Sequence, residues 1–142
     1  MALRGTGDIR LAIVVDPDLS TGFLANTAGA IAIGLGAVAP DLGGTVLGDR
    51  AGVSIMSSAD RPVPILQADA DVMQSLLARA ADRPEGAHLV AFPAFARRLH
   101  SFEDYAAAFP DRLLAAEKLD GLGLAGPANW VRSLTGSLKL LR

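Results

Sequence analysis

The sequence has 142 residues, of which 51% are hydrophobic but only 5% aromatic, and its formal net charge at pH 7 is −2. This apolar content excludes an intrinsically disordered chain or a solvated charged tail, and the near-neutral charge gives no overall attraction to nucleic acid. The length suits one domain over residues 1–142.

Cysteine is absent from the chain, which excludes disulfides, thiolate metal sites and a cysteine nucleophile. Residues 1–8 lack a basic start followed by an apolar stretch, so no secretory signal is expected. The longest run without a polar side chain, residues 28–39, is shorter than the about 20 residues of a membrane span. These features predict a cytoplasmic protein that contacts no membrane, with residues 28–39 mostly buried in a helix.

The first strand is predicted over residues 11–15, where an uninterrupted apolar run indicates a strand covered on both faces. Pro17 follows and cannot continue the ladder. After residues 20–22 a helix is expected to run to about Gly36. Small residues recur along it at helical spacing, beside a stripe of larger ones, so close approach to a sheet or a partner is expected. The small stripe comprises Ala25, Gly29, Ala32 and Gly36, and the larger one comprises Leu24, Ala28, Ile31 and Leu35.

A peripheral hairpin is predicted from residues 46–47 and 53–56, because the turn between them contains aspartate and glycine. Residues 62–66 suggest a strand whose prolines confine it to an edge of the sheet or to its own first residues. Asp69 is the expected N-cap of a helix over residues 70–81. The predicted inner face of that helix comprises Val72, Met73, Leu76, Leu77 and Ala80.

The next strand is predicted over residues 88–92, followed by a short helix over residues 93–99. Ser101 and Asp104 resemble a capping box for a helix over residues 102–109. Strands and helices therefore alternate along the chain, including the strand and helix predicted between residues 122 and 134. The predicted fold class is therefore α/β.

A last core strand is predicted over residues 122–126, and Pro127 begins a helix that runs to about Leu134. The glycines of residues 121–126 match the dinucleotide-binding pattern GxGxxG as a string. However, they fall within the strand, and too little chain follows for a βαβ unit. A close-packed glycine strand is therefore the favoured interpretation, and no cofactor is expected.

Candidate binding residues follow the first strand, because ligands of open α/β sheets bind beyond the carboxyl ends of the strands. Asp16 and Asp18 could bind a cation or act as acid and base, although ending the strand and capping the turn is their simpler role. Thr21 and Gly22 place a hydroxyl group and flexible backbone near a helix N-terminus, which suits an anion. Asn26, one turn later, has a side-chain amide that would need partners if buried, either a ligand or a neighbouring backbone group.

Metal binding and serine catalysis find little support in the sequence. His88 and His100 are the only histidines, and their spacing matches no metal motif, so no metal site is expected. The sequence contains no G-x-S-x-G elbow that would position a catalytic serine.

Two stretches near the ends of the chain share a family pattern. They are IVVDPDLSTG (residues 13–22), followed by Ala25-Asn26 and residues 34–36, and LGLAGP (residues 122–127), followed by LTGSLKLLR (residues 134–142). Together they resemble the bacterial domain-of-unknown-function family number two thousand, with looser agreement at residues 49–52, 64–66 and 102–105.

This resemblance implies a fold similar to type II peptidyl-tRNA hydrolase: a three-layer α/β/α arrangement around a mixed sheet, often in dimers. The hydrolase has lysines directly after the glycine that Gly22 matches, whereas residues 23–25 of this chain are Phe, Leu and Ala. Because those cations would position an RNA backbone, nucleic acid is not expected as a partner of this chain.

The leading hypothesis is a homodimeric protein that binds a small molecule or a protein partner. Its candidate ligand-binding residues are Asp18, Thr21, Gly22, Asn26 and Thr135. The alternative is a divergent hydrolase of peptidyl-tRNA or another ester, in which Asp18, Lys118 or Thr135 replaces the missing groups. The catalytic residues of such an enzyme are not identified by the sequence.

Overall fold

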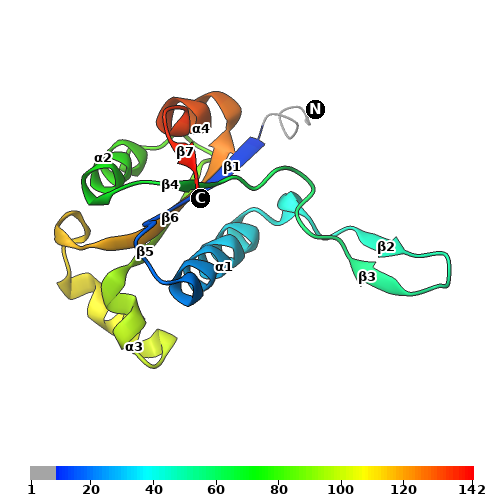
Figure 1. The fold of residues 1–142 in the computed structure, drawn as a ribbon, viewed down its shortest axis with the longest axis horizontal. Coiled ribbons are helices and arrows are strands. Elements are labelled where there is room, and N and C mark those ends of the chain that lie inside the picture. Colours follow the sequence, from blue (N-terminus) through cyan, green and yellow to red (C-terminus); the bar gives the residue numbers. More distant parts are fainter. Residues whose placement is uncertain (1–8) are drawn as a thin grey trace.

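The computed structural model describes residues 9–142, so the expectation for residues 1–8 lies outside the described part of the chain. Five strands form one mixed sheet in the order β5, β6, β1, β4, β7 (Figure 1). β1 runs parallel to β4 and antiparallel to β6, and the other neighbouring pairs are antiparallel. The predicted α/β class and mixed sheet are therefore confirmed. The strands are β1 (Ile9–Val15), β4 (Ile65–Gln67), β5 (His88–Pro93), β6 (Leu119–Pro127) and β7 (Lys139–Leu140).

Helices pack on both faces of this sheet (Figure 1). One face is covered by α1 (Thr21–Val38), and the other by α2 (Ala70–Ala81) and α4 (Ala128–Thr135). Since side chains alternate along a strand, β1 contributes to both apolar cores, as predicted for a strand covered on both faces. Its contributions are Leu11, Ile13 and Val15 on the side of α1, and Ala12 and Val14 on the side of α2 and α4.

The glycines of β6 let α1 lie close to the sheet. A Cβ at Gly121 would lie 2.9 Å from side-chain carbons of both Ile31 and Thr27, and a Cβ at Gly123 would collide with Ile31. The interpretation of residues 121–126 as a close-packed glycine strand is confirmed. The strand itself is longer than predicted, since it begins at Leu119.

α1 presents its larger stripe to the sheet and its small stripe to solvent. Ile31 and Leu35 are fully buried, whereas Gly29, Gly36 and most of residues 28–39 are not, so the prediction that this run is mostly buried is wrong. The physical reason is that the recess lies in β6, whose glycines accept the larger side chains. By length and composition alone, α1 is also apolar enough to cross a membrane.

The predicted hairpin is present as β2 (Val46–Gly48) and β3 (Ser54–Met56), after a single 3-10 turn at Pro40–Leu42. The Asp49 carboxylate accepts the backbone N–H groups of Ala51 and Val53, each at 2.8 Å, and so fixes the turn. The hairpin extends away from the sheet and helices (Figure 1), and every residue from 46 to 56 is exposed.

β4 differs from its prediction because it begins at Ile65, after both prolines. With free backbone N–H groups it pairs with β1 on one side and β7 on the other, so the expectation of an edge strand is wrong. Pro62 and Pro64 lie before the first paired residue of β4, which agrees with the alternative expectation that the prolines are confined to the start of the strand. β7 itself was not predicted, since two residues carry no periodicity.

α2 has the predicted bounds, and the Asp69 carboxylate accepts the N–H of Val72 at 2.9 Å. Val72 is 40% exposed, so its place in the predicted inner face is wrong, while the other four predicted residues are buried. It lies in the first turn of α2 and lines an open surface pocket together with residues 137–139.

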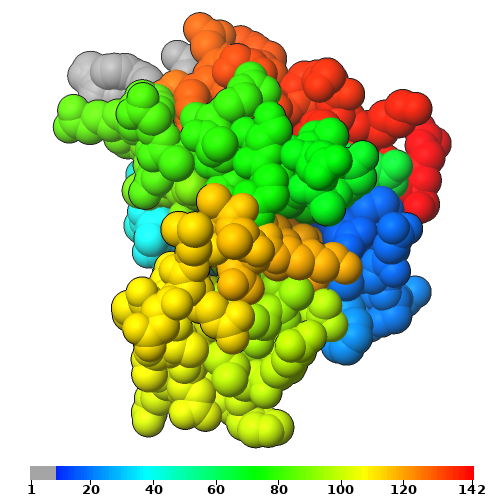
Figure 2. Space-filling model, turned by 90° about the vertical axis from the view of Figure 1, so that its left-hand side faces the viewer, coloured from blue at the N-terminus to red at the C-terminus, as the bar shows by residue number. Residues whose placement is uncertain are grey.

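The chain between β5 and β6 forms a lobe that contains α3 (Phe102–Ala108) (Figure 2). The Ser101 hydroxyl accepts the N–H of Asp104 at 3.1 Å, which confirms the predicted cap. The predicted helix over residues 93–99 is a 3-10 segment, Ala94–Arg98. Further 3-10 turns lie at Phe109–Asp111 and Leu114–Ala116, and the packed rings of the lobe are Phe95, Phe102, Tyr105 and Phe109.

Candidate functional site

Charged side chains gather at both ends of β1. At the carboxyl end four of them form what we term the charged cluster: Asp16, Arg97, Lys118 and Asp120. One Asp16 oxygen accepts the backbone N–H of Asp18 at 2.9 Å, and the other lies 3.5 Å from the Lys118 Nζ. The Asp16 N–H donates to the Asp120 carbonyl at 2.9 Å, which ties the loop to β6.

Asp120 is the buried member of the charged cluster, with no exposed surface. Arg97 binds its carboxylate with two hydrogen bonds, Nε to Oδ2 at 2.5 Å and Nη2 to Oδ1 at 3.2 Å. The hydrogen bond to Asp120, and secondarily the charges of Asp120 and Asp16, raise the pKa of Arg97 against the opposing effect of burial. The guanidinium also lies 4.9 Å from the centre of the Phe23 ring.

The charged cluster satisfies its own charges. Its two cations pair with its two carboxylates, so it carries no net charge to attract an anion. A carboxylate as fully buried as Asp120 needs a hydrogen-bonded cation to offset the cost of its burial. The arrangement therefore fixes the β1–α1 loop, the 3-10 segment and β6 together.

The residues predicted to bind ligand after β1 are solvent-exposed. Asp18 holds the turn through its backbone, and Thr21, Gly22 and Asn26 lie exposed on the first turns of α1. Asn26 is exposed, so its amide can bind water. The assumption that this amide is buried, from which a ligand or a backbone partner was expected, is therefore wrong.

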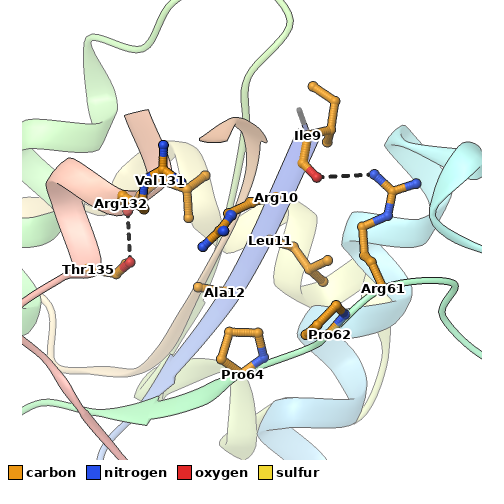
Figure 3. Close-up of a pocket in the computed structure, with 10 residues that line it drawn as sticks. All are labelled: Ile9, Arg10, Leu11, Ala12, Arg61, Pro62, Pro64, Val131, Arg132 and Thr135. Atoms are coloured by element: carbon orange, nitrogen blue, oxygen red, sulfur yellow. Dashed lines mark hydrogen bonds between the residues drawn. The ribbon is translucent and has the colours of Figure 1, made fainter. Parts of the chain in front are cut away.

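Thr135 does not join those four residues. It lies near the amino-terminal half of β1, in a pocket of about 340 Å³ that we term the arginine pocket (Figure 3). The Thr135 hydroxyl donates to the Val131 carbonyl at 2.7 Å. The lining residues are Ile9, Arg10, Leu11, Ala12, Arg61, Pro62, Pro64, Val131, Arg132 and Thr135.

Three elements contribute an arginine to the lining of this pocket: Arg10 from β1, Arg61 from the loop before β4, and Arg132 from α4 (Figure 3). Arg61 is held in place, with Nε 2.6 Å from Asp60 and Nη1 donating to the Ile9 carbonyl at 3.1 Å. The hydrogen bond from Arg61 lowers the pKa of Asp60, so this pair stays ionised at neutral pH.

The other two arginines are not neutralised by any described residue. Arg132 donates to the uncharged Asn129 side chain at 2.6 Å, and the side chain of Arg10 has no hydrogen bond or ion pair within residues 9–142. The arginine pocket therefore carries net positive charge, in contrast to the charged cluster. Sequence analysis missed Arg10 and Arg61 as members of a site, because no local motif links residues so far apart in sequence.

Comparison with known proteins gives a family and a fold. The model of the DUF2000 family, described as a protein of unknown function, matches residues 9–142. No curated protein matches the chain. A solved structure of a protein of unknown function, Atu0240 from Agrobacterium tumefaciens strain C58, superimposes with a TM-score of 0.85. The similarity covers 94% of this chain and 97% of that one, at 17% sequence identity, and so concerns the fold.

Proposed function

Since the chain belongs to the DUF2000 family of proteins of unknown function, its activity has to be inferred from its own side chains, and we propose that it binds a small organic anion in the arginine pocket. The observation that carries the proposal is the presence of Arg10 and Arg132 in one pocket without an acidic partner among residues 9–142. Its volume of about 340 Å³ lies within the range typical of ligand sites.

The lining of the pocket supports an anion with an apolar part. Guanidinium groups present fixed N–H donors that match the two oxygens of a carboxylate or phosphate. Leu11, Pro62 and Pro64 supply apolar wall beside them. A carboxylate or a phosphate ester with a small hydrocarbon portion would satisfy both parts.

Calorimetric titration with inorganic phosphate and with butyrate tests the proposal and separates the two anion classes. Arg10→Gln and Arg132→Gln remove one guanidinium each, and Arg50→Gln, at the exposed tip of the hairpin, is the matched control. We expect each pocket variant to weaken binding of at least one probe about tenfold, the equivalent of about 1.4 kcal/mol, with Arg50→Gln unchanged. Equal binding by all four proteins, or no binding of either probe, would contradict the proposal.

The alternative is ester hydrolysis at the charged cluster, where the Lys118 ammonium lies 3.5 Å from Asp16. Against it, the cluster is neutral, and Thr135 lies toward the other end of β1. A peptidyl-tRNA cleavage assay, run beside an authentic hydrolase, decides the matter. Turnover above the buffer control that is lost in Lys118→Ala would favour hydrolysis.

Three finer features belong to the same proposal. A three-layer arrangement similar to type II peptidyl-tRNA hydrolase is supported by helices on both faces of the mixed sheet, and superposition on that enzyme tests it. A cytoplasmic location is supported by the absence of cysteine, and cell fractionation tests it. A homodimer is supported by exposed apolar surface on α1 and the hairpin.

A further inference from the structure

Two consecutive elements expose apolar side chains to solvent: the outer face of α1 and the hairpin β2–β3. Eleven of the 18 residues of α1 are exposed, and Ile33 is 76% exposed. All eleven residues from 46 to 56 are exposed as well. The large apolar side chains of the hairpin are Val46, Leu47, Val53, Ile55 and Met56.

Such a hairpin needs a surface to pack against. An isolated two-stranded hairpin is at best marginally stable in water, and exposed apolar patches of this kind mark interaction sites. The hairpin extends beyond the end of α1 (Figure 1), so neither of its faces rests on the sheet of its own chain.

We propose that these two surfaces bind each other between two copies of the chain, the hairpin of each protomer lying on the outer face of the partner's α1. A two-fold axis makes this possible, because the same patch on each protomer then covers the other. Two symmetry-related contacts would then cover the outer face of α1 and one face of the hairpin on both chains.

The shapes of the two surfaces are complementary. The small stripe of α1 points outward, and a Cβ placed at Gly29 or Gly36 would meet no atom within 4 Å. This leaves a low surface along the helix. The hairpin offers larger side chains, with Leu47 and Ile55 paired on one of its faces. The alternation of strand side chains places Val46 and Met56 together on the other face.

The size of the surface meets the requirement of a stable dimer. The exposed residues of α1 and of the hairpin, eleven from each, number 22 per protomer, which lies within the about 20–30 residues per side of a standard interface.

The charge distribution favours a second copy over other partners. α1 contains no charged residue, and the hairpin has only Asp49 and Arg50, side by side in the turn. Helices that lie on the surface of a membrane carry a basic polar face, which α1 lacks. Nucleic acid requires several cations, and the two surfaces contain one, Arg50. Neither surface carries a net charge, so the two can pack against each other without repulsion.

Sedimentation velocity from 1 to 100 μM tests this. We expect a dimer for the natural sequence and at least a tenfold higher dissociation constant for Ile33→Glu and for Ile55→Glu. The control is Leu113→Glu, which places the same charge at a residue 70% exposed on the lobe and should remain dimeric. A monomer at 100 μM, or equal dissociation of all three variants, would overturn the proposal. A monomer that cosediments with phosphatidylcholine vesicles would also overturn it if Ile33→Glu abolished the cosedimentation, because the outer face of α1 would then bind a membrane.

Cross-linking gives an independent measurement that does not require a charged substitution. Because the chain has no cysteine, Gly29→Cys and Ile55→Cys can be prepared as separate proteins and mixed under mild oxidation. A disulfide between the two different proteins is expected, and Leu113→Cys mixed with Gly29→Cys should give none beyond background. Equal cross-linking in both mixtures would contradict the arrangement.

Discussion

The two ends of β1 carry similar numbers of charges but differ in how those charges are satisfied. At the carboxyl end, Asp120 is fully buried and each cation of the charged cluster has a carboxylate partner. At the amino end, Asp60 neutralises Arg61, while Arg10 and Arg132 have no acidic partner among the described residues. This difference shows that a cluster of charged side chains indicates a ligand site only when some of those charges have no partner of opposite charge within the protein.

The largest expected effect comes from breaking the charged cluster. Asp120→Asn leaves Arg97 without its carboxylate, and removing one partner of a buried pair costs about 3 kcal/mol. We expect a loss of about that size in the free energy of unfolding, measured in urea. Asp18→Asn, an exposed aspartate of the neighbouring loop, is the control and should change it by less than about 0.5 kcal/mol. A loss equal to that of the control would show that the Arg97 pairing is not structural.

A second prediction concerns the close packing of α1 on β6. Gly123→Ala places a methyl group against Ile31 and Leu35, so we expect a loss of stability of about 1–3 kcal/mol. Gly29→Ala has open space and should raise the stability of the monomer by about 1 kcal/mol, measured below the dimer dissociation constant. The same sign of change in both variants would contradict the assigned orientation of α1.

Changing the charge balance of the arginine pocket gives a smaller effect. Asp60→Asn removes the carboxylate beside Arg61, so anion affinity should rise a few-fold. Phosphate titration measures it. The Arg61 hydrogen bond holds the pKa of Asp60 below 3.8, so the pair persists at neutral pH, and its contribution to stability is lost only as the pH falls through that lowered pKa. An unchanged affinity would place the anion away from Arg61.

The smallest effect is expected for Lys118→Ala. This ammonium is 58% exposed and its ion pair spans 3.5 Å, so its loss should cost less than about 1 kcal/mol. Phosphate affinity should remain that of the natural sequence, since Lys118 lies in the charged cluster at the carboxyl end of β1 and not in the arginine pocket. A loss of affinity in this variant would move the anion site to the charged cluster.

The elements with strong local patterns were predictable from sequence. β1 follows from five consecutive apolar residues, and α2 from its cap at Asp69 and its helical spacing. The orientation of α1 was not predictable, because periodicity gives two stripes without saying which one meets the sheet. That choice depends on the recess at Gly121 and Gly123, about 90 residues away in the chain.

The candidate site was predictable only in part. Thr135 lies in the arginine pocket, but Arg10 and Arg61 join it through the order of strands β4 and β1, which no local motif reports. The aspartates after β1 were recognisable as a charged loop. Their neutralisation depends on Arg97 and Lys118 from other elements, so the balance of charge appears only in the fold.

The central claim, that an anion binds at the amino end of β1 rather than at the carboxyl end, is tested most directly by chemical-shift mapping of ¹⁵N-labelled protein with inorganic phosphate and butyrate. The predicted result is saturable shifts of backbone amides at residues 9–12 and 131–135, with residues 16–23 and 118–120 unmoved. Saturable shifts confined to residues 16–23 and 118–120 would contradict it.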